Sequence, residues 1–215
     1  DAQVPITHVP FRAGTTHQLT QGLHEGNAYD FGFGNFATGG YDLDIVSAAP
    51  GVVVALIQDR TSPVYGIYDN TCYTTHNNYI EVLHDDGSRA RYSHIATNSA
   101  RFAVGDHVNY GDVIASQGNV GCTNGQTHLH YQYWNPSGQP TEPVFIEQPY
   151  QHDFNDGVGI RTLYDSQNQP SITGTAPAFT SSDHVYVVAG QNLNHVVTYS
   201  GDPTPTLVFE SENLP

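Results

Sequence analysis

The sequence predicts an all-β protein, and three of its features support that fold class. The chain has 215 residues, of which 21 are glycine and 14 are tyrosine, so turn-forming and strand-forming residues are both abundant. Short apolar runs alternate with turn residues along the chain. No segment shows the 3.6-residue periodicity of a long amphipathic helix. The length allows one sizeable domain, or one domain with a small additional module.

The chain begins irregularly and then turns to strand-forming sequence. Residues 1–23 mix Pro, Gly, Thr and His, which favours irregular chain with one short strand. Residues 41–57 are strand material, and Pro50-Gly51 predicts a turn between two apolar runs within them. A polar loop is expected over residues 58–78.

A β-hairpin is the clearest element in the middle of the chain. Residues 79–84 and 89–95 both alternate between apolar and polar side chains, and the Asp86-Gly87 pair between them is typical of a hairpin turn. Residues 104–108 and 111–115 have the character of short strands that meet at glycines.

The segment Gly121–Trp134 is a loop that continues into a strand, with the sequence G-C-T-N-G-Q-T-H-L-H-Y-Q-Y-W. Residues two apart on a strand project from the same face, so His128 and His130 would face one point in space while Leu129 faces a core. Two converging imidazoles can bind a metal ion together, or one can bind it while the other transfers protons.

The character of the sequence changes towards the C-terminus. We predict a main domain over residues 1–148 and a small β-rich extension of unknown role over residues 149–215. Three strands are expected in the extension, at 185–188, 195–199 and 206–209. They could form a module of their own or pack on the main domain.

The charge of the chain excludes several classes of partner. The formal net charge is -15, and all six basic residues are arginines. Nucleic acid and anionic membrane surfaces would repel such a chain, and no apolar run is long enough to cross a bilayer. We expect neither as a partner, and we expect a monomer.

The N-terminus and the cysteines suggest export from the cytoplasm. The chain begins at Asp1 without methionine, which we interpret as a processed mature terminus of a secreted or periplasmic protein. In that compartment Cys72 and Cys122 would form a disulfide, which stabilises by about 4 kcal/mol on the chain-entropy model. The alternative is two buried free thiols.

Several His and Asp residues lie near glycines or at strand ends in otherwise ordered sequence. A catalytic zinc site takes three ligands from the protein and leaves one position for water, a count that two imidazoles and one carboxylate satisfy. Two further imidazoles beside the metal could take a proton from that water and stabilise an oxyanion. The candidates are His24, Asp30, His94, His128 and His130.

Five motifs follow one another along about residues 21–134. In chain order these are H-x-G-x-A-Y-D-F, A-A-P-G-V-V-V-A, Y-S-H, V-G-D-x-V-x-x-G-D-V-I-A and T-H-L-H-Y. This ordered set resembles the lysostaphin-like and β-lytic zinc metallopeptidases. The resemblance implies an antiparallel β-sheet with its site in a groove between loops. It also implies cleavage of peptidoglycan peptides, generally next to glycine in cross-bridges or stem peptides, and for some β-lytic relatives cleavage of elastin.

The resemblance also implies roles for the candidate residues. One zinc ion would be bound by His24, Asp30 and His130, and His128 with His94 would act as general base and oxyanion partner.

The sequence departs from the commonest pattern of this family, because Asp30 lies six positions after His24 rather than in a tighter H-x-x-x-D. Asp42 or Asp44 could therefore supply the carboxylate instead, and His17 is the rival for the first histidine. The chain beyond residue 149 has no counterpart in the resemblance.

We therefore expect a secreted zinc metalloendopeptidase that hydrolyses glycine-adjacent bonds in peptidoglycan or in glycine-rich proteins such as elastin. The strong negative charge favours a salt-tolerant enzyme over a basic wall-binding lysin. The alternatives are a non-catalytic domain of the same fold that binds wall peptides or a protein partner, and a protein with a purely structural metal.

Overall fold

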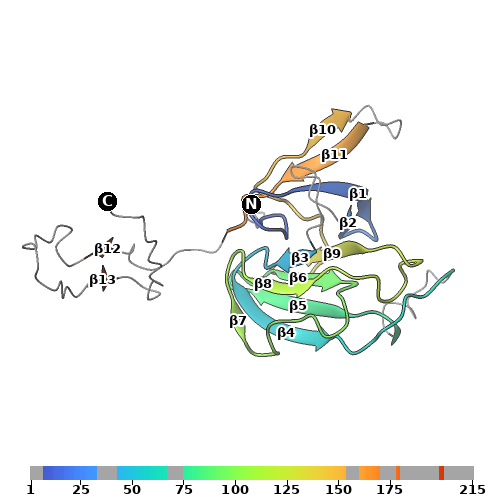
Figure 1. Cartoon of the computed structure of the whole chain (residues 1–215), viewed down its shortest axis with the longest axis horizontal. Helices are drawn as coiled ribbons and strands as arrows, with labels where there is room; N and C mark the ends of the chain where they lie inside the picture. Colours follow the sequence, from blue (N-terminus) through green and yellow to red (C-terminus); the bar gives the residue numbers. More distant parts are fainter. Residues whose placement is uncertain are drawn as a thin grey trace, which may run out of the picture. The chain divides into compact units, whose positions relative to one another are not determined.

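A computed structural model of the chain describes residues 7–32, 43–66, 75–153 and 160–169, together with the short strands at 178–179 and 199–200. Antiparallel strands dominate these residues (Figure 1), which confirms the predicted all-β class. The chain divides into two compact units, Asp1–Pro170 and Ser171–Pro215. None of the helical residues in the described ranges forms a segment long and apolar enough to cross a bilayer.

The first unit is built on a nine-stranded sheet in the order β10-β11-β1-β2-β9-β6-β5-β4-β7. A separate antiparallel pair joins β3 (Asp44–Val46) to β8 (Val113–Ser116). The strands of the large sheet are β1 (Thr16–His24), β2 (Ala28–Gly32), β4 (Gly51–Ile57), β5 (Tyr79–His84), β6 (Arg89–Ser93), β7 (His107–Val108), β9 (His128–Trp134), β10 (Tyr150–Asp153) and β11 (Ile160–Asp165).

One face of the large sheet is buried in an aromatic core. Strand β9 contributes Leu129, Tyr131 and Tyr133 to it, all almost completely inaccessible to solvent. The intervening His128 and His130 project from the opposite face, because side chains alternate along a strand. The predicted division of this strand is therefore confirmed: apolar and aromatic side chains face the core, and both histidines share the other side.

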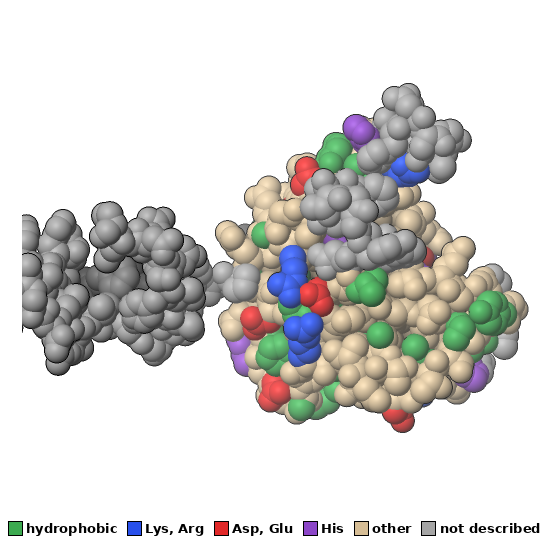
Figure 2. Space-filling model, viewed as in Figure 1, with side chains coloured by type: hydrophobic (Ala, Val, Ile, Leu, Met, Phe, Trp, Pro, Cys, Tyr) green, Lys and Arg blue, Asp and Glu red, His purple; other side chains and the backbone are tan. Residues whose placement is uncertain are grey.

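The face that carries His128 and His130 also carries a cluster of charged side chains, on the neighbouring strands β5 and β6. Glu81 is buried and pairs with Arg89 at 3.0 Å and with Arg91 at 2.8 Å. The guanidinium of Arg89 lies 4.6 Å from the ring centroid of Trp134, at the end of β9. Two of the six arginines therefore neutralise a buried carboxylate. Few basic side chains appear on the face that Figure 2 shows.

The predicted hairpin is present as β5 and β6, which pair with Leu83 opposite Arg89. Gly87 in its turn has φ +87°, a conformation that glycine adopts without steric cost.

The main unit extends further than the predicted boundary at residue 148. Strands β10 and β11 form a hairpin whose second strand pairs with β1, so they belong to the large sheet. The carboxylate of Glu147 also accepts hydrogen bonds from the backbone N–H of Val9 at 3.0 Å and of Gln167 at 2.9 Å. The first unit therefore ends at about Pro170, because β10 and β11 belong to its large sheet.

The second unit contains a short antiparallel pair, β12 (Ala178–Phe179) and β13 (Tyr199–Ser200). The strands predicted at 185–188 and 206–209 lie outside the described residues, as does all but the last residue of the one predicted at 195–199.

Candidate metal centre and active site

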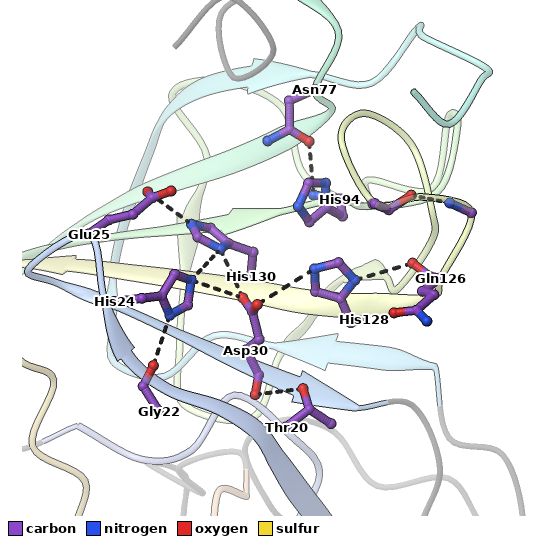
Figure 3. Close-up of polar contacts among 12 residues, drawn as sticks. Thr20, Gly22, His24, Glu25, Asp30, Asn77, His94, Gln126, His128 and His130 are labelled. Atoms are coloured by element: carbon purple, nitrogen blue, oxygen red, sulfur yellow. Dashed lines mark hydrogen bonds and ion pairs between the residues drawn. The ribbon is translucent and has the colours of Figure 1, made fainter. Parts of the chain in front are cut away.

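Three neighbouring strands bring His24, Asp30 and His130 together. Asp30 on β2 lies directly opposite His130 on β9, and His24 ends β1 at the turn into β2. The Nδ1 of His130 lies 2.9 Å from Oδ1 of Asp30 and 3.3 Å from Nε2 of His24. The Nε2 of His24 lies 3.5 Å from the same Oδ1, which closes a triangle of potential ligand atoms (Figure 3).

The dimensions of this triangle fit a zinc ion. Tetrahedral zinc with bonds of about 2.0–2.1 Å places its ligand atoms roughly 3.3 Å apart, and the three separations here are 2.9, 3.3 and 3.5 Å. Two imidazole nitrogens and one carboxylate are also a donor set that zinc prefers. The residues present therefore match a catalytic rather than a structural zinc site, because structural sites use four protein ligands.

Hydrogen bonds orient the ring nitrogens of His24 and His130. The Nδ1–H of His24 donates to the backbone carbonyl of Gly22 at 2.8 Å, which leaves the lone pair on Nε2 directed at the site. His130 uses the other nitrogen, Nδ1, towards Asp30 and His24. Each imidazole thus directs one ring nitrogen at the point where a cation would lie, Nε2 of His24 and Nδ1 of His130.

Asp30 is ionised in this environment. Burial alone would raise its pKa, but the hydrogen bond from His130 and the neighbouring imidazoles lower the pKa of Asp30 below its usual value. A carboxylate in a cluster of histidines supplies the negative charge that a divalent cation requires.

His94 and His128 lie beside this triangle as a second pair. Their ring centroids are 4.6 Å apart, and Nε2 of His128 lies 4.0 Å from Oδ2 of Asp30. The Nδ1–H of His94 donates to the carbonyl of Val120 at 2.9 Å, and that of His128 donates to the carbonyl of Gln126 at 3.2 Å. Each ring therefore keeps Nε2 available as a proton acceptor.

Burial keeps both of these imidazoles neutral. It lowers the pKa of His94 to about 3, with a further lowering by the neighbouring His128 and His130. Burial also lowers the pKa of His128, although Asp30 opposes that effect. A neutral imidazole at neutral pH can accept a proton, which is the property that a general base needs.

The backbone at His94 is unusual. Its φ is +64°, which is uncommon for a residue other than glycine. The N–H of His94 donates to the carbonyl of Asn78 at 2.9 Å and to Oδ1 of Asn77 at 3.3 Å. Such strained conformations persist where surrounding contacts hold them, and they are concentrated at functional sites.

Two pockets meet at the candidate site and form one groove. The first has a volume of about 400 Å³ and contains the metal triangle, and the second, of about 360 Å³, adjoins it. They share Gln21, Asp30, Gln126 and His128. The residues that line only the second pocket are Gln18, Thr20, Gly32 and Thr127, and none of them is charged.

The rival ligands lie elsewhere or outside the described residues. His17 is buried in the core, where its ring stacks on Phe11 with centroids 3.6 Å apart. The carboxylate of Asp44 pairs with Arg12 at 2.6 Å and with Arg101 at 3.3 Å. Asp42 lies outside the described residues.

Cys122 lies in the loop that lines the first pocket. Its predicted partner, Cys72, lies outside the described residues, so the disulfide stays a prediction.

Sequence reasoning missed Asn77, Gly118 and Glu25. A Cβ at Gly118 would lie 2.7 Å from the backbone of Ala96 and 3.0 Å from the carbonyl oxygen of His94, so this glycine permits the close approach of the two loops that carry the histidine pair. For Gly118 the sequence offered one signal, a glycine in the segment that precedes the T-H-L-H-Y motif. The position of Glu25 between His24 and Gly26 gave no comparable indication.

Comparison with known protein families identifies the family to which the chain belongs. The family model of peptidase family M23 matches residues 34–143. The chain belongs to peptidase family M23. It is therefore a metallopeptidase related to the lysostaphin-like peptidases, as the motifs implied, and M23 peptidases are zinc-dependent. The matched range includes His94, His128 and His130 but begins after Asp30, so the fold brings the first two ligand candidates to this M23 site.

Solved structures of M23 peptidases are similar to this chain. Pseudoalterin, an M23 metalloprotease from the deep sea, is 17% identical with a TM-score of 0.45 over 67% of this chain and 81% of its own. The catalytic domain of lysostaphin from Staphylococcus simulans is 24% identical with a TM-score of 0.35 over 62% and 84%. A zinc-containing peptidase from Vibrio cholerae is 21% identical with a TM-score of 0.40 over 62% and 39%. No curated protein sequence matches the chain.

Proposed function

We propose that the chain is a secreted or periplasmic zinc endopeptidase that hydrolyses glycine-adjacent bonds in peptidoglycan peptides or in glycine-rich proteins. One observation carries the proposal: two imidazoles and a carboxylate form a triangle with zinc-binding dimensions, and a second pair of neutral imidazoles stands beside it. A structural metal site would have no use for that second pair.

The proposed roles follow from the chemistry of each group. His24, Asp30 and His130 would hold one zinc ion, which when bound supplies Lewis acidity towards water and the scissile carbonyl. His128, whose Nε2 lies 4.0 Å from Oδ2 of Asp30, accepts a proton from the attacking water. Once protonated, an imidazole of the pair can donate to the oxyanion of the peptide or to the leaving amine.

The groove favours an extended peptide with small side chains. Its second half offers side-chain amides and hydroxyls from Gln18, Thr20 and Gln126, which can pair with peptide N–H and C=O groups. No Lys or Arg occurs among the described residues that line either pocket. Gly32, which also lines this half, has no side chain to occupy it, and a Cβ there would lie 3.0 Å from the side chain of Thr20.

The test combines metal analysis with a digestion assay. Protein loaded with one equivalent of zinc should release new amino groups from pentaglycine and from purified peptidoglycan, and a chelator should abolish this release until zinc is restored. A variant of an exposed histidine outside the site, His107→Ala, should cleave normally. Zinc binding with tight peptide binding but no cleavage would overturn the proposal in favour of a non-catalytic wall-binding domain.

A further inference from the structure

The turn between β1 and β2 has an unusual residue at its tip. The N–H of Asn27 donates to the carbonyl of His24 at 3.2 Å, and both residues between them have positive φ, +52° at Glu25 and +81° at Gly26. Positive φ at both central positions is the property of a type I′ turn, which selects Asn, Asp or Gly at the first of them. Glutamate is a poor choice there, so local turn stability does not explain Glu25.

The carboxylate of Glu25 faces the Nε2 side of the His130 ring, away from Asp30 (Figure 3). Its Oε2 lies 3.9 Å from Nε2 of His130, and the side-chain amide of Gln132 donates to the same Oε2 at 3.5 Å. His130 and Gln132 are two residues apart on β9 and share the face that carries the site. The turn conformation therefore places an acid on the far side of a candidate ligand.

The chemistry of His130 requires an acceptor at that position. Its Nδ1 faces Asp30 and His24, so when Nδ1 binds a cation the proton of the ring must be on Nε2. This side chain is only 3% exposed, and a buried N–H needs a hydrogen-bond partner. Histidine ligands of metals commonly donate that second N–H to a carboxylate, which fixes the ring and raises the basicity of the nitrogen that binds the metal.

We propose that Glu25 is a positioning residue for the metal ligand His130. Its carboxylate accepts the Nε2–H of His130, directly after a small side-chain rotation from 3.9 Å or through one bridging water. The unfavourable turn conformation is retained because it delivers this carboxylate. The inference rests on the metal site of the proposed function, and it assigns to Glu25 a role in zinc affinity rather than in the chemical step.

The test measures two properties of Glu25 variants, the melting temperature of the metal-free protein and the affinity for zinc. Glu25→Asn and Glu25→Gly introduce residues that a type I′ turn favours, so the metal-free proteins should melt at the same temperature as the wild type or higher. Their zinc dissociation constants, measured by competition with a chromogenic chelator, should rise about 10–100-fold. Glu25→Gln keeps an acceptor oxygen and should show the smaller loss.

A matched control removes one acid from another hairpin turn. Asp85→Asn, in the turn between β5 and β6, changes the net charge equally and should leave zinc affinity unchanged. Wild-type affinity in Glu25→Asn and Glu25→Gly would overturn the role of Glu25 while leaving the metal site intact. A wild-type protein that binds no zinc would overturn both.

Discussion

The imidazoles of His94 and His128 pack against each other with ring centroids 4.6 Å apart, and each donates its Nδ1–H to the carbonyl of a residue in a loop. His94 follows β6 and His128 begins β9, two strands that are neighbours in the sheet. Sheet pairing therefore sets the separation of the two rings, and the loop carbonyls set their rotation. The candidate ligands His24, Asp30 and His130 lie beside them, so the proposed metal ligands and the proposed proton-transferring residues form two separate groups.

That separation predicts different consequences for neighbouring histidines. His128→Ala should retain zinc but lower kcat by about 10²–10⁴-fold, the usual contribution of a general base. His130→Ala should lose both zinc and activity, because it removes one corner of the triangle. Bound zinc, measured by atomic absorption beside peptide cleavage rates, distinguishes the two. Normal cleavage by His128→Ala would show that the proton-transfer role is assigned to the wrong residue.

Gly118 should be essential to the same geometry. A Cβ at this position would lie 2.7 Å from the backbone of Ala96, so Gly118→Ala must displace the segment that carries His94. We expect a loss of about 1–3 kcal/mol in unfolding free energy and a lower kcat with zinc retained. His107→Ala is the control, because His107 is exposed and lines neither pocket. Equal activity in both variants would contradict the prediction.

Burial of His17 should make the fold sensitive to acid. Burial lowers the pKa of His17 from 6.5 to about 4, so between these values the unfolded chain binds a proton that the folded protein does not. The stabilisation is complete above pH 6.5 and is lost as the pH falls towards 4, by about 3 kcal/mol in total. His17→Phe should flatten this dependence in urea unfolding between pH 4.5 and 7.5. Part of the slope should remain, because burial lowers the pKa of His84 similarly. An unchanged slope would refute the assignment to His17.

The two cysteines should form one disulfide. Alkylation of the unfolded but unreduced protein should add no mass, and reduction should expose two thiols. Cys122→Ser should lower the free energy of unfolding by about 4 kcal/mol, because the bridge restricts the unfolded chain. Two modified thiols without reductant would contradict the pairing of Cys72 with Cys122.

Salt should affect wall hydrolysis differently from hydrolysis of a neutral peptide. The net charge of -15 repels a negatively charged wall, and screening within about 10 Å at 0.1 M salt weakens that repulsion. Rates on purified wall should therefore rise with moderate salt, whereas rates on pentaglycine should change little. A steep fall on wall alone would indicate an attractive electrostatic contribution instead.

The tertiary structure decided which carboxylate joins the histidines. Asp30 and Asp44 both lie near strand-forming sequence, and only the pairing of β2 with β9 places Asp30 opposite His130 while Asp44 turns to Arg12. The same holds for Glu25 and Gly118, whose importance depends on what lies across from them in another strand or loop. Strands β10 and β11 likewise gained their place through pairing with β1, a contact between residues more than 140 positions apart.

Local sequence patterns were enough to predict the fold class, the hairpin around Gly87 and the two faces of β9, including the shared orientation of His128 and His130. These properties depend on the two-residue period of a strand and on turn chemistry, which act over a few neighbouring residues. The identity of strand neighbours, their register and the approach of loops depend on how the whole core packs. For that reason the shared face of His128 and His130 could be predicted from the sequence, whereas the complete site could be described only from the folded chain.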